Sequence, residues 1–271
     1  MNPEQFQTFN LTIANHIAHV AINRPDRANA LNQTAWHEMK AIFEALDDND
    51  DVRAVVLSGE GKHFCAGIDL ELLMDISQFA HQCEGRKREK LRKRVFELQA
   101  PINAIEQCSK PVIAAIHGGC IGGAVDIISA CDMRYCTDDA YFCIREIDMG
   151  MVADLGTLQR LPKLIAPGIV RELAYTGRNV LGPEAERIGL ANRSYPDQAT
   201  LLAEVQKVAE MIAQKSPLSI RGTKAILNHT RDHSVADGLD YIATWNAAML
   251  VSDDLMEAFQ AKMQKRAGVY Q

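Results

Sequence analysis

Hydrophobic and polar positions change their period along the chain, and these changes predict its elements. Residues 11–23, LTIANHIAHVAIN, alternate apolar and polar positions on both sides of Ala14 and Asn15, which predicts a β-hairpin. Residues 34–50 have helical spacing, with apolar positions at Trp36, Met39, Ile42, Phe43 and Leu46. Buried strands are expected in the short apolar runs VRAVVLSG, PVIAAIHG, MRYCT and AYFCI. This alternation of strands and helices predicts an α/β layered core.

The pattern becomes wholly helical after about residue 197. Pro217 suits the start of a helix, and Ser252 or Asp253 suits an N-cap position. We therefore predict a core over residues 1–196 and a helical region over residues 197–271, which packs on the core or on another subunit. Four helices are expected there, over residues 197–215, 217–230, 234–252 and 253–266.

Composition narrows the class of protein. The chain has 271 residues, 47% of them hydrophobic and 24% charged, as soluble globular proteins have. A net charge of −6 argues against nucleic-acid binding, and no apolar run is long enough to span a bilayer. The N-terminal MNPEQFQTFN does not resemble a signal peptide, and the seven cysteines form no C-x-x-C pair. These features predict a cytoplasmic protein with reduced thiols.

Two glycine-containing turns are candidates for chemistry. AIHGGCIGGAVDIISACD, residues 115–132, places a glycine-rich turn between a strand and a helix, where free amides can meet a ligand. Its order G-G-x-x-G-G differs from a dinucleotide fingerprint, and Ala124 and Val125 follow where a P-loop needs Lys and Ser or Thr. HFCAGIDLELL, residues 63–73, follows a second strand and offers Asp69 as a helix N-cap. The two turns could supply the two converging amides of an oxyanion hole, although close helix–strand packing explains such glycines equally well.

Several motifs together resemble the crotonase, or enoyl-CoA hydratase/isomerase, superfamily. They are GKHFCAGIDLELL, KPVIAAIHGGCIGGAVDIISACDMRY and GTLQRLPKLI, joined by NRPDRANALN and EAFQAKMQKR near the two ends. The resemblance spans nearly the whole chain. It implies an α/β crotonase-like spiral of ββα units, a C-terminal helical trimerisation region, and a homo-oligomer that is a trimer or a dimer of trimers. It also implies an acyl-CoA thioester substrate, with coenzyme A as part of the substrate and no separate cofactor.

The resemblance also implies site residues. The backbone N–H groups of Ala66 and Gly123 would be the oxyanion donors, beside the positive end of a helix. Coenzyme A would be bound by Arg27, Ala28, Ala66, Ile68, Asp69 and Leu70, with Phe259 and Lys262 reaching the site of a neighbouring subunit.

Three acids decide which chemistry of the superfamily applies. Asp126 and Glu146 match the two carboxylates with which hydratases hold a water molecule. Asp154 follows eight residues after Glu146, where hydratases usually carry a small residue. The set resembles the Δ3,5-Δ2,4-dienoyl-CoA isomerase subgroup, which acts in fatty-acid β-oxidation. Taken alone, Asp126 could be a hydrogen-bonded structural acid and Asp154 a helix N-cap.

The isomerisation gives the third acid a purpose. Moving a proton from C2 to C6 of a dienoyl thioester spans four bonds, which one carboxylate can hardly serve but two can. We assign Glu146 and Asp154 to the transfer, without fixing which takes the C2 proton, although Asp154 is favoured. Asp126 would tune Glu146, since two close buried carboxylates raise each other's proton affinity. An enoyl-CoA hydratase, in which Asp154 is incidental, is the alternative.

Other candidates have simpler explanations. Seven basic residues between Arg86 and Arg94 are typical of a solvated helix face, with attraction of coenzyme A and, remotely, nucleic-acid binding as alternatives. His229 and His233 lack a neighbouring acid at ligand spacing, so no metal site is predicted. Cys65 is expected to pack near the thioester rather than to act as a nucleophile.

Overall fold

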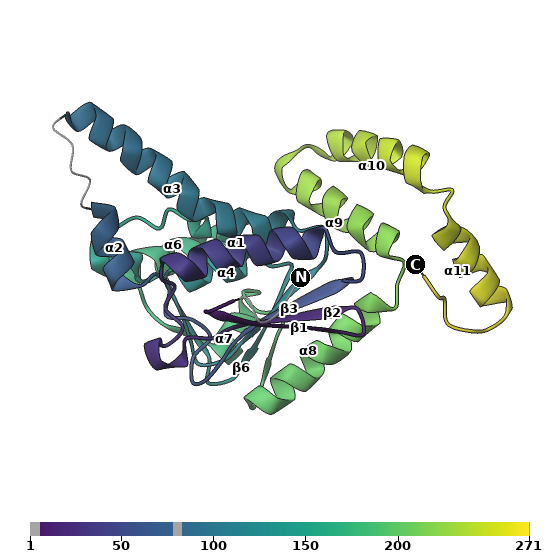
Figure 1. Cartoon of the computed structure of the whole chain (residues 1–271), viewed down its shortest axis with the longest axis horizontal. Helices are drawn as coiled ribbons and strands as arrows, with labels where there is room; N and C mark the ends of the chain where they lie inside the picture. Colours follow the sequence, from purple (N-terminus) through teal and green to yellow (C-terminus); the bar gives the residue numbers. More distant parts are fainter. Residues whose placement is uncertain (1–5, 78–82, 271) are drawn as a thin grey trace.

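A six-stranded sheet forms the centre of the protein in a computed structural model that describes residues 6–77 and 83–270 (Figure 1). Within this sheet, only the first two strands, β1 (Phe9–Ala14) and β2 (Ile17–Ile22), pair antiparallel. Asn15 and His16 form their turn with positive φ, which confirms the predicted hairpin. The other neighbouring strands pair in parallel. The order is β1 (Phe9–Ala14), β2 (Ile17–Ile22), β3 (Ala54–Gly59), β4 (Val112–Ile116), β6 (Met133–Thr137) and β9 (Arg193–Tyr195).

Helices cover both faces of this sheet. Successive strand residues point to opposite faces, so Val55 and Leu57 face one core cluster while Ala54 and Val56 face the other. The first cluster is closed by α1 (Gln33–Asp47), α3 (Glu84–Gln107) and α4 (Gly123–Ala130). The second is closed by α8 (Gln198–Ala213). The predicted α/β layering is confirmed.

A smaller sheet carries the second half of the core. It pairs β5 (Gly119–Ile121), β7 (Tyr141–Cys143) and β8 (Val180–Leu181). Because β5 belongs to the glycine-rich turn, this sheet fixes the turn against the segment that follows β7. Short helices complete this half: η3 (Arg145–Met149), α5 (Thr157–Arg160), η4 (Leu161–Lys163), α6 (Pro167–Thr176) and α7 (Gly182–Arg187).

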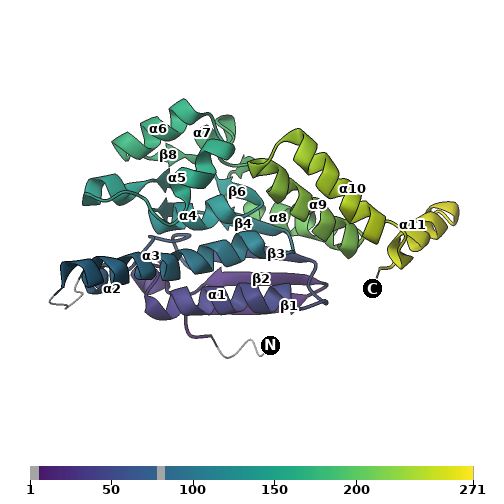
Figure 2. The same cartoon turned by 90° about the horizontal axis from the view of Figure 1, so that it is seen from above.

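Three C-terminal helices extend to one side of the core: α9 (Pro217–Asp232), α10 (Val235–Met249) and α11 (Asp253–Met263) (Figures 1 and 2). Ser252 caps α11, as predicted. The first of the four predicted helices is α8, which packs on the large sheet and not beside the other three. The predicted boundary between core and helical region at residue 196 stays a prediction. Within the described ranges, no helix is both long and apolar enough to cross a membrane. These outer helices expose large apolar side chains, among them Leu227, Val235, Leu239, Leu250, Met256, Phe259 and Met263.

Candidate active site

The two glycine-containing turns meet at one edge of the large sheet. They follow β3 and β4, which are neighbouring parallel strands, so both turns leave the same edge. Cys65 and Cys120 then form a further parallel bridge. The Cys65 amide donates to the Gly119 carbonyl at 3.0 Å, and the Ile121 amide donates to the Cys65 carbonyl at 3.1 Å. The predicted convergence of the turns is therefore observed.

The free amide of the first turn belongs to Ile68. The Ala66 amide, predicted as an oxyanion donor, donates to the Ala28 carbonyl at 2.9 Å and is not free. The flanking amides of Gly67 and Asp69 contact the Cys65 Sγ atom at 3.3 Å and the Leu31 carbonyl at 3.0 Å, respectively. Ile68 N–H has no acceptor among the described residues. The assignment to Ala66 was wrong, because pairing with the 28–31 segment uses its amide.

The second free amide is that of Gly123, at the first position of α4. Like that of Ile68, it has no acceptor in the part of the chain that the structure describes. A Cβ atom on Gly123 would lie 3.5 Å from the Ile68 nitrogen, so the two amides are neighbours. Gly67 has a φ of +86°, and a Cβ there would lie 3.0 Å from the Gly123 nitrogen, so this close approach requires glycine.

Asp126 is buried in the first turn of α4, with 1% of its surface exposed. Its Oδ1 atom accepts the Thr157 amide at 2.6 Å, which makes it the cap of α5 as well as a site acid. Burial raises its pKa to about 7, although the Thr157 hydrogen bond opposes this rise. The charges of Glu146 and Asp154 raise the pKa further. The three acids thus form one electrostatically coupled group.

Glu146 lies on η3, directly after β7. Its Oε1 atom is 3.3 Å from the place that a Cβ on Gly122 would take, which puts the carboxylate beside the start of α4. Its Oε2 atom is buried and has no hydrogen-bond partner among the described residues. Burial raises the pKa of Glu146, and the Asp154 charge adds to the rise. An unpaired buried carboxylate oxygen is costly in a resting protein and available to a substrate.

Asp154 lies on the segment between η3 and α5 and is the exposed member of the group. The N-cap of α5 is Gly156, without a side-chain cap, so Asp154 does not cap this helix. That role belongs to Asp126. Partial burial nevertheless raises the pKa of Asp154.

The predicted coenzyme A turn contacts the glycine-containing turn at residues 63–73. It consists of η2 (Pro25–Arg27) and residues 28–30, with Ala28 at a φ of +49°. Arg24 pairs with Asp69 at 3.1 Å and ties the two turns together. Asp69 also accepts the Glu71 amide at 3.1 Å, which confirms it as a cap at the start of α2 (Leu70–Ser77). Arg27 and Leu70 are exposed at this side.

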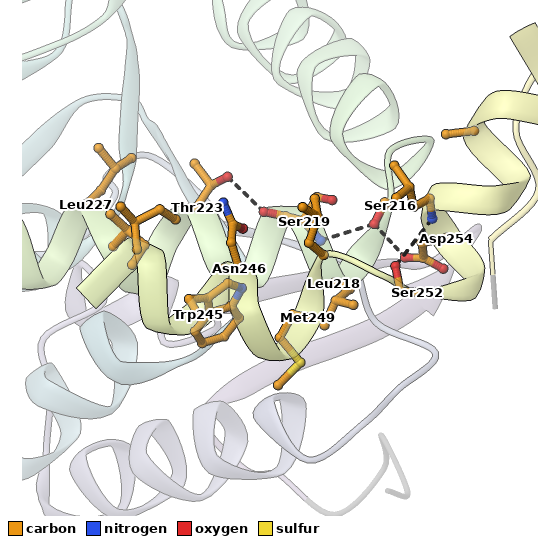
Figure 3. Close-up of a pocket in the computed structure, with 16 residues that line it drawn as sticks. Ser216, Leu218, Ser219, Thr223, Leu227, Trp245, Asn246, Met249, Ser252 and Asp254 are labelled. Carbon is orange, nitrogen blue, oxygen red and sulfur yellow. Dashed lines mark hydrogen bonds between the residues drawn. The ribbon is translucent and has the colours of Figure 1, made fainter. Parts of the chain in front are cut away.

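Phe259 and Lys262 do not join this group within one chain. Both are exposed on α11, which lies at the opposite side of the protein from α2 in both views (Figures 1 and 2). Between α9, α10 and α11 there is a pocket of about 420 Å³, lined by Leu218, Trp245 and Met249 among others (Figure 3). None of the three acids lines it.

The three remaining candidates have different surroundings. Burial raises the pKa of Cys65 to about 12, so its thiol is not a ready nucleophile. The rings of His229 and His233 stack with centroids 3.8 Å apart. The basic residues from Arg86 to Arg94 lie on the exposed first half of α3, where Arg94 pairs with Glu97 at 3.1 Å. The alternatives involving coenzyme A or nucleic acid stay predictions.

Sequence comparison agrees with this geometry. The family model described as enoyl-CoA hydratase/isomerase matches residues 12–271. The chain belongs to the enoyl-CoA hydratase/isomerase family. This membership confirms the resemblance drawn from the motifs. An enoyl-CoA hydratase from Bacillus anthracis has the same fold, with a TM-score of 0.88, 29% identity and coverage of 97% of this chain and 99% of that chain.

Two relatives in the family carry a more specific name. The peroxisomal Delta(3,5)-Delta(2,4)-dienoyl-CoA isomerase of Arabidopsis thaliana is 49% identical over 271 residues, covering 98% of either chain. The mitochondrial enzyme of that name from Rattus norvegicus is 45% identical over 269 residues, covering 98% of this chain and 82% of the rat protein. Because both names include an organelle, the cytoplasmic location stays a prediction.

The contacts of two residues within the predicted coenzyme A turn were not identified from the sequence. Arg24 pairs with Asp69, and the Asn29 Nδ2 atom donates to the carbonyls of Glu60 and His63, both at 2.8 Å. Asn29 follows Ala28 in a left-handed conformation, which Asn tolerates, and this is the signal that could have marked it. The free Ile68 amide has no sequence signal, because its freedom depends on which neighbouring amides find acceptors.

Proposed function

We propose that this chain is a dienoyl-CoA isomerase that converts a 3,5-dienoyl-CoA into a 2,4-dienoyl-CoA. The observation that carries the proposal is a third carboxylate, Asp154, which is electrostatically coupled to Asp126 and Glu146. Glu146 in turn lies beside the start of α4, where the Gly123 amide is free. The relatives from Arabidopsis thaliana and Rattus norvegicus support it by their names and their near-complete alignment.

In the proposed reaction, the amides of Ile68 and Gly123 bind the thioester oxygen. One of Glu146 and Asp154 removes a proton from C2, and the electron pair spreads over the dienolate onto that oxygen. The other acid then delivers a proton to C6, and the double bonds move from the 3,5 to the 2,4 positions. Protons balance, because one carboxylate ends the cycle protonated and the other deprotonated, and exchange with solvent restores both. Raised pKa values suit groups that must both take and give protons near neutral pH.

We also propose that the chain assembles as a trimer or a dimer of trimers and binds coenzyme A between subunits. Arg27, Ala28, Asp69 and Leu70 would contact it from one chain. The side chains of Phe259 and Lys262 would contact it from a neighbour, since α11, which carries them, lies on the opposite side of the protein from α2 (Figures 1 and 2). The apolar side chains exposed on α9 to α11 support burial between subunits.

The hydratase alternative needs only Asp126 and Glu146. The test is an assay of the wild-type protein with 3,5-dienoyl-CoA and 2-enoyl-CoA side by side, repeated on Asp154→Asn. We expect isomerisation by the variant to fall about 10²–10⁴-fold in kcat, with KM nearly unchanged. Any weak hydration should survive. If both activities fall together, or if isomerisation persists at the wild-type rate, the hydratase alternative is favoured.

A further inference from the structure

The Asp154 carboxylate is not held by other side chains. Across residues 6–77 and 83–270, no hydrogen bond or ion pair joins it to another side chain, and the residue is exposed. A proton-transferring group must nevertheless lie within about 3 Å of the carbon or proton that it serves. Its position must therefore come from the backbone that carries it.

That backbone is held at two successive carbonyls. The Gln99 side-chain amide donates to the Asp154 carbonyl at 2.6 Å. The Arg160 Nη1 atom donates to the next carbonyl, that of Leu155, at 3.4 Å. Two residues further on, the Thr157 amide binds Asp126. The 154–157 segment thus connects two of the three acids and is fixed from outside by Gln99 and Arg160.

Gly156 lets the Arg160 guanidinium reach this segment. Gly156 has a φ of +134°, and a Cβ there would lie 1.8 Å from the Arg160 Nη1 atom. The guanidinium therefore occupies the space that any other side chain at position 156 would need. Glycine at position 156 thus permits both the positive φ of the turn and the position of the Arg160 guanidinium.

Arg160 is itself oriented by one face of α3. Its Nε and Nη2 atoms bind the two carboxylate oxygens of Glu106 at 3.0 and 2.9 Å, and Nη2 also binds the Asn103 amide oxygen at 2.8 Å. Gln99, Asn103 and Glu106 recur at intervals of four and three residues, so they share one helix face. They line a polar pocket of about 320 Å³ with Arg160 and Arg231.

The ion pair between Glu106 and Arg160 orients the Arg160 side chain more than it stabilises the fold. Burial disfavours ionisation of Glu106, but hydrogen bonds from Arg160 and Arg231 prevail and lower its pKa. A buried ion pair adds little net stability, because desolvation offsets the attraction, yet a bidentate arginine–carboxylate pair has a fixed geometry. With its pKa lowered, Glu106 stays ionised at the pH of about 7 at which Asp126 titrates.

We propose that Gln99, Glu106 and Arg160 are positioning residues that set the Asp154 carboxylate for proton transfer. This inference rests on the proposed function. The network acts through the backbone of Asp154, so its loss should impair the chemical step and leave binding of the distant coenzyme A moiety unchanged.

The test compares Gln99→Met with Gln159→Met. Gln159 lines the same pocket, and its side chain makes no hydrogen bond among the described residues. With 3,5-dienoyl-CoA, Gln99→Met should lower kcat about 10- to 100-fold at constant KM, while Gln159→Met should match the wild type. Arg160→Lys, which keeps the charge but not the bidentate geometry, should resemble Gln99→Met.

A double-mutant cycle separates positioning from general damage. If Gln99 acts through Asp154, adding Gln99→Met to Asp154→Asn causes no further loss. A full additional loss in the double variant, or wild-type turnover by Gln99→Met, would overturn this inference alone. Absence of turnover by the wild-type protein would overturn the proposed function and this inference together.

Discussion

Replacing Asp126 by Asn should stabilise the protein increasingly as the pH rises. The carboxyl group has a pKa of about 7 in the folded protein against an ordinary value of 3.8. Between these values the unfolded chain has released the proton and the folded chain still holds it, so stability falls as pH rises through this window. At 1.36 kcal/mol per pKa unit, the full penalty above pH 7 is about 4 kcal/mol. At pH 5 it is roughly 1–2 kcal/mol.

Asn suits this test because its Oδ1 atom can still accept the Thr157 amide. Its NH₂ group does not titrate. The quantity to follow is therefore the difference in unfolding free energy between Asp126→Asn and wild type. It should shift in favour of the variant by roughly 3 kcal/mol from pH 5 to pH 8.

The assay is denaturant unfolding at both pH values and at one protomer concentration, because assembly contributes to apparent stability. Asp148→Asn is the control, since Asp148 is exposed and pairs with Arg145 at 2.8 Å on the surface. The change measured for Asp126→Asn is compared with that of this control. A pH-independent difference for Asp126→Asn would refute the argument that burial among two acids raises the pKa of Asp126.

Two further predictions follow from the amides and from the outer helices. Ile68→Pro removes a proposed oxyanion donor and should lower kcat at least about 10²-fold, while Ile68→Leu, which keeps the amide, should stay near wild type. Wild-type kcat in an Ile68→Pro variant with a normal circular-dichroism spectrum would contradict the assignment. Light scattering at micromolar concentration should give a mass larger than one chain, because α9 to α11 expose too much apolar surface, and a stable monomer would refute that assembly.

The layered fold could be predicted because its elements follow simple periodicities. The hairpin at residues 9–22 alternates, α1 places Trp36 and Phe43 on one buried face, and β3 and β4 carry the apolar runs AVVL and VIAAI. The placement of α8 on the sheet was less visible. In the sequence it reads as an amphipathic helix like α9 and α10, and it is distinguished by the packing of Leu201, Val205, Ala209 and Ala213 on the second core cluster.

The site could be predicted in part. The three acids stand at motif positions, and the structure couples them. The free amide of the first turn was predicted at Ala66 and lies at Ile68, because a backbone hydrogen bond from Ala66 to Ala28 leaves no trace in the sequence. The contacts of Gln99 and Arg160 with the 154–155 backbone could not be predicted from the sequence either. Both side chains donate to backbone carbonyls, and Gln99 lies 55 positions from Asp154.

The most direct test of the two-carboxylate mechanism is proton exchange in D₂O with the Glu146→Gln and Asp154→Asn variants. Deuterium is followed by NMR at C2 of 3,5-dienoyl-CoA and at C6 of 2,4-dienoyl-CoA. Each variant should lose exchange at one carbon and keep it at the other, with the two variants complementary. If one variant loses exchange at both carbons, or neither variant loses it at either, the proton does not pass between Glu146 and Asp154.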